Sequence, residues 1–581
     1  MPFQARSVPP EGASLPRASR RTSEWLAASG AAVLSVLLYA STLDNPFVYD
    51  DFRLIVENPA IQTLSDIRTV MVRDITRPLV NLTYISDTAV WGTRPFGYHL
   101  TNVVLHALNV IAVFWVAFWA AEDWRSKGGG RYGFSPSPRV VAIATSLLVA
   151  AHPIMTQAVG YITGRSELLY GLFFLLSWLA ARRWMHVGGW WRSATLFLWL
   201  LSVLAKETAA MLPVVLWCYD AWLIEDGAGT RMRRIKGLYA PLGLAVLLFG
   251  VGRLAVLATL EYPKDVGPNW RYVFVETDVF WQYVALFILP KGQSLVHTVP
   301  DFTSLTIRAV AGAIGLAGLV GAAWSLRRIQ AVVSLGLVVC VAMLLPSSVL
   351  FIMGIGEPMA EHRAYVSAMG FFLALGAASG MAWSRARSFG RGTLVLGASA
   401  VVFLAQLAGL TIVRNAIWGD PVALAREATA RSPGHWMPRL FLGETLRQNG
   451  RCPEAVAEYR AVLDLRTRDT FARKKLLSCL IQTGRIPEAE TELHTLRTLE
   501  PESPESGLGL GLLAIAQGDT VAGRGYFAEV LAHNPGHQEA SQFVALIDGT
   551  LPEPHRSRLC GLVRAVAASS EQNASAGSVC R

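Results

Sequence analysis

The sequence predicts an all-α protein in which a polytopic helical membrane domain precedes a solenoid of helical repeats. Three observations carry this prediction: an apolar composition, basic residues in alternate loops, and a 34-residue period in the C-terminal part. Apolar residues make up 52% and charged residues 16% of the 581 residues, whereas soluble domains carry about 25% charge. Most of the chain must therefore face lipid, which excludes a purely soluble enzyme, a disordered protein and a disulfide-rich secreted scaffold.

Eleven apolar runs are predicted to span the membrane. The first, 25–43, follows a basic segment, 1–23, and is long enough to cross the hydrocarbon core. Basic residues cluster in every second loop, which places the N-terminus in the cytoplasm and the C-terminus outside; the net charge of +10 has this origin. A shorter run, 279–289, is expected to be re-entrant or interfacial. The other ten spans are expected near 98–120, 139–153, 165–182, 193–206, 208–224, 238–259, 306–325, 330–353, 364–383 and 393–413.

The repeat follows the membrane domain, 24–414. The pattern Gly-Arg-x-Pro-Glu-Ala begins at Gly450 and again at Gly484, and a weaker copy begins at Gly518. This step of 34 residues is the tetratricopeptide period, and it predicts a short tetratricopeptide solenoid at 420–550. Such solenoids bind extended peptides or partner proteins, although this one could instead pack only on the membrane domain. Residues 551–581 are small and polar and are expected to be disordered.

The first external loop, 44–97, carries two adjacent carboxylates, Asp50 and Asp51, directly after the first span. One of them could act as a general base that takes a proton from a hydroxyl acceptor. The pair could instead hold a divalent cation through oxygen ligands or form a solvated turn. The six cysteines show no spacing typical of a zinc site.

Further polar residues fall on the same external side of the predicted topology. Cations beside a membrane helix suit a phosphate ester, and carboxylates suit activation of a hydroxyl. Each also has a structural interpretation, as a helix-end hydrogen bonder, an ion pair or a snorkelling lysine. The residues are Arg77, His99, His106, His152, Arg165, Glu167, Lys206, Glu361, His362 and Arg363.

Several motifs together resemble a known family. They are Phe47-Val48-Tyr49-Asp50-Asp51, Arg77-Pro78-Leu79, Gly97-Tyr98-His99-Leu100, Leu105-His106, His152-Pro153, Gly164-Arg165 and Glu361-His362-Arg363-Ala364-Tyr365. With the repeats, they look like the transmembrane and tetratricopeptide repeat-containing family of GT-C glycosyltransferases, which is related to the protein O-mannosyltransferases. The resemblance implies an inverting transfer of a sugar, such as mannose, from a polyprenyl-phosphate donor to a protein Ser or Thr hydroxyl.

The resemblance also implies roles for these residues. Asp50 matches the catalytic base by position, and Asp51 would position the acceptor or a cation. Lys206, Arg363 and Arg165 would bind the donor phosphate. The polyprenyl-phosphate-linked sugar would be the donor. No other cofactor is expected, and a divalent cation on Asp50 and Asp51 is optional. The supporting residues are His152, Glu167, His99, His106, Arg77, Glu361 and His362.

Three other functions compete with this interpretation. A non-catalytic membrane scaffold would use the repeats alone and would tolerate loss of Asp50. An O-antigen-ligase-like enzyme would need a late external loop rich in Arg and His, whereas the large loop here comes first and carries carboxylates. A transporter would be expected to show an inverted repeat, and the predicted spans show none. The predicted partners are a lipid-linked sugar and an acceptor polypeptide, with no nucleic acid. The expected location is a bacterial inner membrane with periplasmic repeats, or else the endoplasmic reticulum membrane with lumenal repeats.

Overall fold

The computed structural model describes residues 17–58, 61, 77–129, 135–224, 228–256, 269–299, 306–354, 356–501, 503–568 and 580. These residues form helices, turns and loops without any strand, as the sequence predicts. The chain divides into two compact units. The first holds Met1–Leu295 and Val299–Asp420, and the second holds Val296–Thr298 and Pro421–Arg581.

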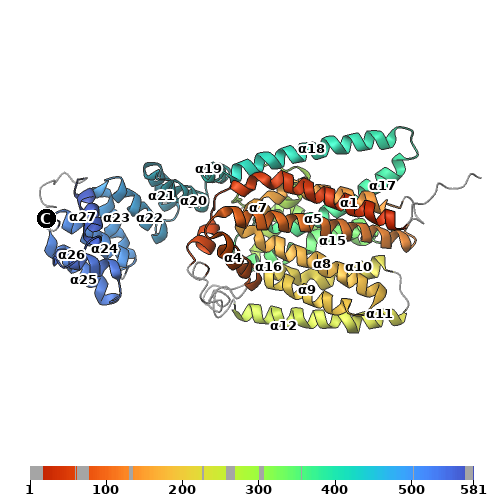
Figure 1. Cartoon of the computed structure of the whole chain (residues 1–581), viewed down its shortest axis with the longest axis horizontal. Coiled ribbons are helices and arrows are strands. Elements are labelled where there is room, and N and C mark those ends of the chain that lie inside the picture. Colours follow the sequence, from red (N-terminus) through yellow and green to blue (C-terminus); the bar gives the residue numbers. More distant parts are fainter. Residues whose placement is uncertain are drawn as a thin grey trace, which may run out of the picture. The chain divides into compact units, whose positions relative to one another are not determined.

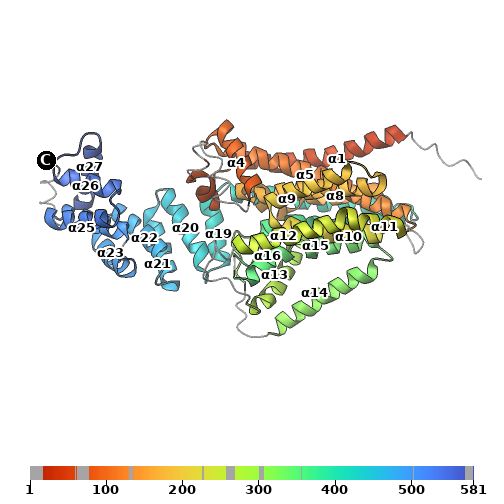
Figure 2. The ribbon, with the colours of Figure 1, turned by 90° about the horizontal axis from the view of Figure 1, so that it is seen from below.

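The first unit is a bundle of apolar helices (Figures 1 and 2). They are α1 (Arg17–Tyr39), α4 (Pro78–Trp91), α5 (Pro95–Ser126), α6 (Pro138–Ala151), α7 (Thr156–Gly160), α8 (Arg165–Val187), α9 (Trp191–Ala205), α10 (Leu212–Leu223), α11 (Ala228–Arg234), α12 (Ala240–Val256), α13 (Arg271–Ile288), α14 (Ile307–Leu326), α15 (Ala331–Ala342), α16 (Leu345–Ile352), α17 (Tyr365–Ala386) and α18 (Gly392–Trp418).

The number of spans is roughly consistent with the predicted eleven. Seven of the described helices are long and apolar enough to cross a membrane, and α6 with α7, which are bent by 55°, would form an eighth. Helices α8, α9 and α10 occupy the other three predicted spans. The run expected to be re-entrant, 279–289, forms the C-terminal part of α13, a helix of 18 residues whose C-cap is Leu289.

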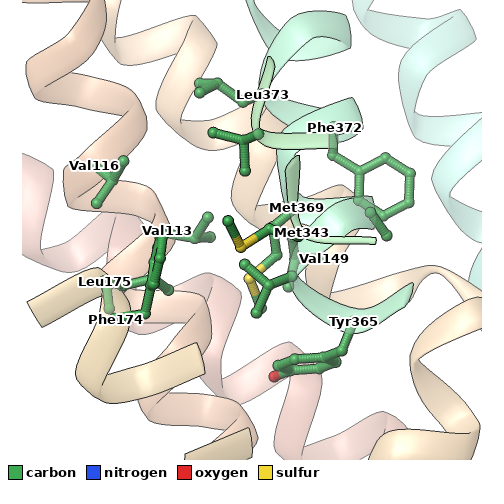
Figure 3. Close-up of a cluster of buried hydrophobic side chains, with 14 of the residues drawn as sticks. Val113, Val116, Val149, Phe174, Leu175, Met343, Tyr365, Met369, Phe372 and Leu373 are labelled. Carbon is green, nitrogen blue, oxygen red and sulfur yellow. The ribbon is translucent and has the colours of Figure 1, made fainter. Parts of the chain in front are cut away.

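The core of this unit lies where α5, α6, α8, α15 and α17 pack together. Figure 3 shows the thioethers of Met343 and Met369 beside Val149, with Phe174 and Phe372 nearby. Helices α15 and α17 approach closely because glycines face each other. A Cβ atom added to Gly336 would lie 2.6 Å from the carbonyl oxygen of Gly370. This contact fixes α17, whose N-terminal end reaches the external face of the predicted topology.

The second unit is a stack of helix pairs (Figure 1). Gly450, Gly484 and Gly518 all have φ between 72° and 92°, a left-handed conformation that suits glycine at the end of a helix. The helices are α19 (Pro421–Arg431), α20 (Trp436–Gln448), α21 (Cys452–Leu465), α22 (Thr470–Gln482), α23 (Ile486–Leu499), α24 (Pro504–Ala516), α25 (Thr520–His533), α26 (Gln538–Ile547) and α27 (His555–Ala568).

The final helix, α27, lies in the segment that composition predicts to be disordered. Its large apolar residues include Leu559, Val563 and Val566, which are buried, and the helix packs against α24. A disulfide also joins Cys560 to Cys580. The polar composition therefore concealed a short amphipathic helix that completes the repeat stack.

Candidate active site

The segment after α1 has an unusual backbone. A short 3-10 turn, Ala40–Asp44, ends the helix, and the chain then passes through Tyr49, whose φ is 52°. Among the described residues it is the only non-glycine with a positive φ. Strained conformations of this kind persist where the surroundings enforce them, and they cluster at functional sites. Here the strain directly precedes Asp50 and Asp51.

Asp51 is fully buried and is held by three donors. One carboxylate oxygen accepts a hydrogen bond from the backbone nitrogen of Val48 at 3.0 Å. The other accepts from the backbone nitrogen of Thr163 at 3.0 Å and from its hydroxyl at 2.6 Å. Burial raises the pKa of Asp51 to about 7, although these hydrogen bonds oppose the rise. Asp51 therefore ties the first external segment to the turn that precedes α8.

Asp50 is the accessible member of the pair, since 39% of its side chain is exposed. Its carboxylate lies 3.6 Å from the guanidinium of Arg53. Desolvation raises the pKa of Asp50 above the usual carboxyl value, while the charges of Arg53 and Arg77 oppose this shift. A carboxylate that is both reachable and more basic than usual suits proton abstraction from a hydroxyl group.

Tyr161 lies beside the aspartate pair, and sequence reasoning missed it. Its ring centroid is 6.5 Å from that of Tyr49, 6.3 Å from that of His362 and 5.8 Å from that of Trp418. Burial and the charges of Asp50 and Asp51 raise the pKa of Tyr161. The available signal was its position in the short external turn between His152 and Arg165. Thr163, which contacts Asp51, was missed in the same turn.

Three of the predicted cations interact electrostatically around Glu167, and one of them, Arg77, also interacts with Asp50. Arg77, at the start of α4, interacts electrostatically with Asp50, Glu167 and Lys206. The ammonium group of Lys206 pairs with Glu167, and both side chains are buried. Arg363 also interacts electrostatically with Glu167. The structure thus brings Arg77, Glu167, Lys206 and Arg363 into one interacting group, which Arg77 connects to Asp50.

Arg165 occupies a different, enclosed position. Its guanidinium is completely buried and lies 2.5 Å from a carboxylate oxygen of Asp87. It also donates to Asn102 at 2.9 Å and to the carbonyl oxygen of Tyr98 at 2.8 Å, and it lies over the ring of Tyr84. These contacts join α8 to α4 and α5. The donors of the guanidinium are therefore used in contacts between helices.

Three of the supporting histidines are buried, and two of them have a polar contact through the ring. Nδ1 of His106 lies 2.8 Å from the Tyr365 hydroxyl, and Nε2 of His152 lies 3.1 Å from the carbonyl oxygen of Phe287. His99 is buried within α5.

Glu361 and His362 lie in the turn before α17. The carboxylate of Glu361 accepts from the backbone of Ser294 at 2.6 Å and from Gln293 at 2.8 Å. The backbone of His362 donates to the Gln157 side chain at 2.6 Å, while its ring faces the Tyr161 side of the site. Glu361 thus anchors the turn that carries His362 and Arg363.

A candidate metal centre is not apparent in the described part of the chain. No group of three or more His, Cys, Asp or Glu side chains there has a metal-binding arrangement. The carboxylate of Asp51 is occupied by its three donors.

Comparison with known proteins places this geometry in context. The tetratricopeptide repeat family model matches residues 422–469. Protein O-mannosyl-transferase TMTC1 of Homo sapiens is 26% identical over 531 residues, which cover 79% of this chain and 58% of the relative. Protein O-mannosyl-transferase Tmtc1 of Drosophila melanogaster is 25% identical over 540 residues, which cover 75% of this chain and 61% of the relative.

A third relative matches a shorter part with higher identity. Protein O-mannosyl-transferase TMTC4 of Homo sapiens is 30% identical over 199 residues, which cover 30% of this chain and 26% of the relative. The resemblance predicted from the motifs and repeats is confirmed, because homologues with these names cover about three quarters of the chain. The chain spans about three fifths of the length of the first two relatives.

Proposed function

We propose that this chain is a multi-pass membrane glycosyltransferase of the GT-C type, which moves a sugar from polyprenyl phosphate to a protein Ser or Thr hydroxyl. The observation that carries the proposal is the accessible Asp50 carboxylate beside its buried, anchored neighbour Asp51. Both follow a strained residue, and Arg77, which interacts electrostatically with Asp50, also interacts with the Glu167–Lys206 pair. The names of the relatives support the same reaction class.

In the proposed reaction, Asp50 takes the proton of the acceptor hydroxyl. The hydroxyl oxygen attacks the anomeric carbon of the donor sugar, and the bond from that carbon to the phosphate oxygen breaks. The phosphate leaves with the bonding electrons, so one displacement inverts the anomeric configuration. Arg363 and Lys206, assisted by Arg77, stabilise the charge that develops on the leaving phosphate.

Arg165 has another role in this proposal. Its enclosed contacts with Asp87, Asn102 and Tyr98 favour positioning of α8, which also carries Glu167. Glu167 in turn holds Lys206. We therefore propose that Arg165 supports the phosphate-binding residues through helix packing, and that it does not contact the phosphate itself.

The repeats are proposed to bind the acceptor polypeptide. The last residues of the membrane unit return to the site, since Trp418 stacks near Tyr161 and Asn415 donates to the carbonyl oxygen of Leu38. The repeats follow directly in the chain, from Pro421 onward. A bound polypeptide would gain a high effective concentration at the site. The proposed location is a bacterial inner membrane with the repeats in the periplasm.

A transfer assay in vesicles tests the proposal. Proteoliposomes that contain the full chain receive a Ser/Thr-rich acceptor peptide and a labelled donor. The donor is polyprenyl-phosphate mannose or, in a parallel assay, polyprenyl-phosphate glucose. Asp50→Asn is expected to lower the transfer rate by about 10² to 10⁴, the range typical of a lost general base. Asp44→Asn is the matched control, because Asp44 is an exposed carboxylate of the same segment.

Two outcomes would overturn the proposal. Equal transfer by wild type and Asp50→Asn would remove the base. Absence of transfer from any polyprenyl-phosphate sugar by correctly folded protein would favour a non-catalytic scaffold built on the repeats.

A further inference from the structure

A second polar site lies far from the aspartates. A cavity of about 600 Å³ is formed by the start of α1, the end of α5 and the start of α6. The aspartates follow the other end of α1, a helix of 23 residues, which is about 35 Å long at 1.5 Å per residue. Figure 1 shows the start of α1 and the end of α5 together at one end of the membrane unit. The positive-inside rule places that end in the cytoplasm.

Three arginines line this cavity: Arg21, Arg125 and Arg139. Arg125 pairs with Glu122 at 2.8 Å, and Arg139 pairs more loosely with Glu24 at 3.8 Å. Arg21 is exposed, and no carboxylate in the described part of the chain pairs with it. Three guanidiniums therefore face two carboxylates, which leaves the lining with an excess of one positive charge.

One wall of the cavity is aromatic. Trp115, Phe118 and Trp119 line it, and the indoles of Trp115 and Trp119 stack at 6.4 Å. Aromatic rings of this kind offer apolar contact area beside the charged groups.

We propose that this cavity binds the phosphodiester headgroup of an anionic phospholipid of the cytoplasmic leaflet. Arginine guanidiniums match phosphate oxygens, basic pockets between membrane helices on this side suit anionic headgroups, and tryptophans favour the interfacial depth. The cavity volume lies in the range of small-molecule sites. The apolar faces of Trp115, Phe118 and Trp119 contact the glycerol backbone and the first part of the acyl chains. This site is independent of the proposed sugar transfer.

Lipid titration of the purified full chain tests the proposal by native mass spectrometry. Phosphatidylglycerol is expected to bind at least five times more tightly than phosphatidylcholine. The double variant Arg21→Gln/Arg139→Gln is expected to lose affinity for phosphatidylglycerol by about fivefold for each arginine, the factor that corresponds to about 1 kcal/mol per basic residue. Arg192→Gln is the matched control, because Arg192 is an exposed arginine outside the cavity. This variant should bind phosphatidylglycerol with the affinity of wild type.

Three results would overturn the proposal. The first is equal affinity of wild type for the two lipids. The second is displacement of phosphatidylglycerol by millimolar inorganic phosphate, which would identify a free-phosphate site. The third comes from photoreactive phosphatidylglycerol on wild-type protein, which does not depend on the folding of a variant: crosslinks outside 21–25, 115–125 and 137–139 would place the lipid elsewhere.

Discussion

Thr163 donates two hydrogen bonds to a single carboxylate oxygen of Asp51, from its backbone nitrogen at 3.0 Å and from its hydroxyl at 2.6 Å. The two residues are 112 positions apart in the chain. This contact fixes the first external segment against the turn before α8, and it sets the position of Asp50. The two aspartates therefore differ in role: Asp51 anchors the segment, and Asp50 is accessible to solvent.

Asp51→Ala should destabilise the protein. The change leaves the Val48 backbone donor and both Thr163 donors without their acceptor in a buried place, which should cost about 1–3 kcal/mol or more. Thr163→Val removes only the hydroxyl donor, so it should lower the stability less than Asp51→Ala does. The measurement is the midpoint of thermal unfolding in detergent. Asp50→Ala is the control and should change stability by no more than about 0.5 kcal/mol, as expected of a solvent-accessible residue; a wild-type midpoint for Asp51→Ala would contradict the anchoring role.

The pH dependence of transfer should report the ionisation of Asp50. A general base works only when deprotonated, and desolvation raises the pKa of Asp50. Activity should therefore fall on the acid side, with a midpoint above the ordinary aspartate value of about 3.9. Arg53→Gln removes a charge that lowers this pKa, so the acid limb of the kcat profile should move to higher pH. An acid limb that stays in place in Arg53→Gln would mean that another group controls it.

Arg165 offers a test that separates helix packing from phosphate binding. Arg165→Met leaves the buried carboxylate of Asp87 without its partner, and breaking a buried pair typically costs about 3–5 kcal/mol. The double variant Arg165→Met/Asp87→Leu removes both charges and should recover much of the lost stability. Thermal unfolding midpoints of the single and double variants form the measurement. A stable Arg165→Met protein with a raised KM for the donor would instead assign Arg165 to the phosphate.

The membrane helices were predictable from local signals. Each of the eleven predicted runs corresponds to a helix or to consecutive helices. The length and apolarity of a span and the arginines that flank it are local features of the sequence, so they can be read without knowing the fold. The glycines at 450, 484 and 518 gave the repeat for the same reason, since each turn needs a left-handed residue. Helix α27 was not predicted because its buried face consists of a few apolar residues within a polar segment.

The arrangement of the site was only partly predictable. The topology placed Asp50, Lys206 and Arg363 on one side, but it did not reveal which cations are paired within the bundle. Lys206 pairs with Glu167, whereas Arg165 pairs with Asp87. These choices depend on how α4, α5 and α8 pack, which a linear pattern does not encode. Tyr161 and Thr163 carry no motif, and only the fold brings them to the aspartates.

The cysteines provide a chemical test of the side of the membrane on which the repeats lie. Disulfides join Cys452 to Cys479 and Cys560 to Cys580, while Cys218 and Cys340 are free thiols in the membrane unit. Disulfides form and persist in oxidising compartments. If the repeats lie outside the cytoplasm, as proposed, protein denatured with an alkylating agent and no reductant should gain two labels per chain. After reduction it should gain six, one for each cysteine.

Paired substitutions identify the bonds in this experiment. Cys452→Ser/Cys479→Ser should still gain two labels without reductant, because Cys560 and Cys580 remain joined, whereas Cys452→Ser alone should gain three. Loss of the Cys452–Cys479 bond, which closes a loop of 27 residues, should lower stability by about 3 kcal/mol. Labels are counted by intact-mass spectrometry on protein extracted directly from membranes. Six labels without reductant would place the repeats in a reducing compartment. This result would contradict the proposal that the repeats lie outside the cytoplasm.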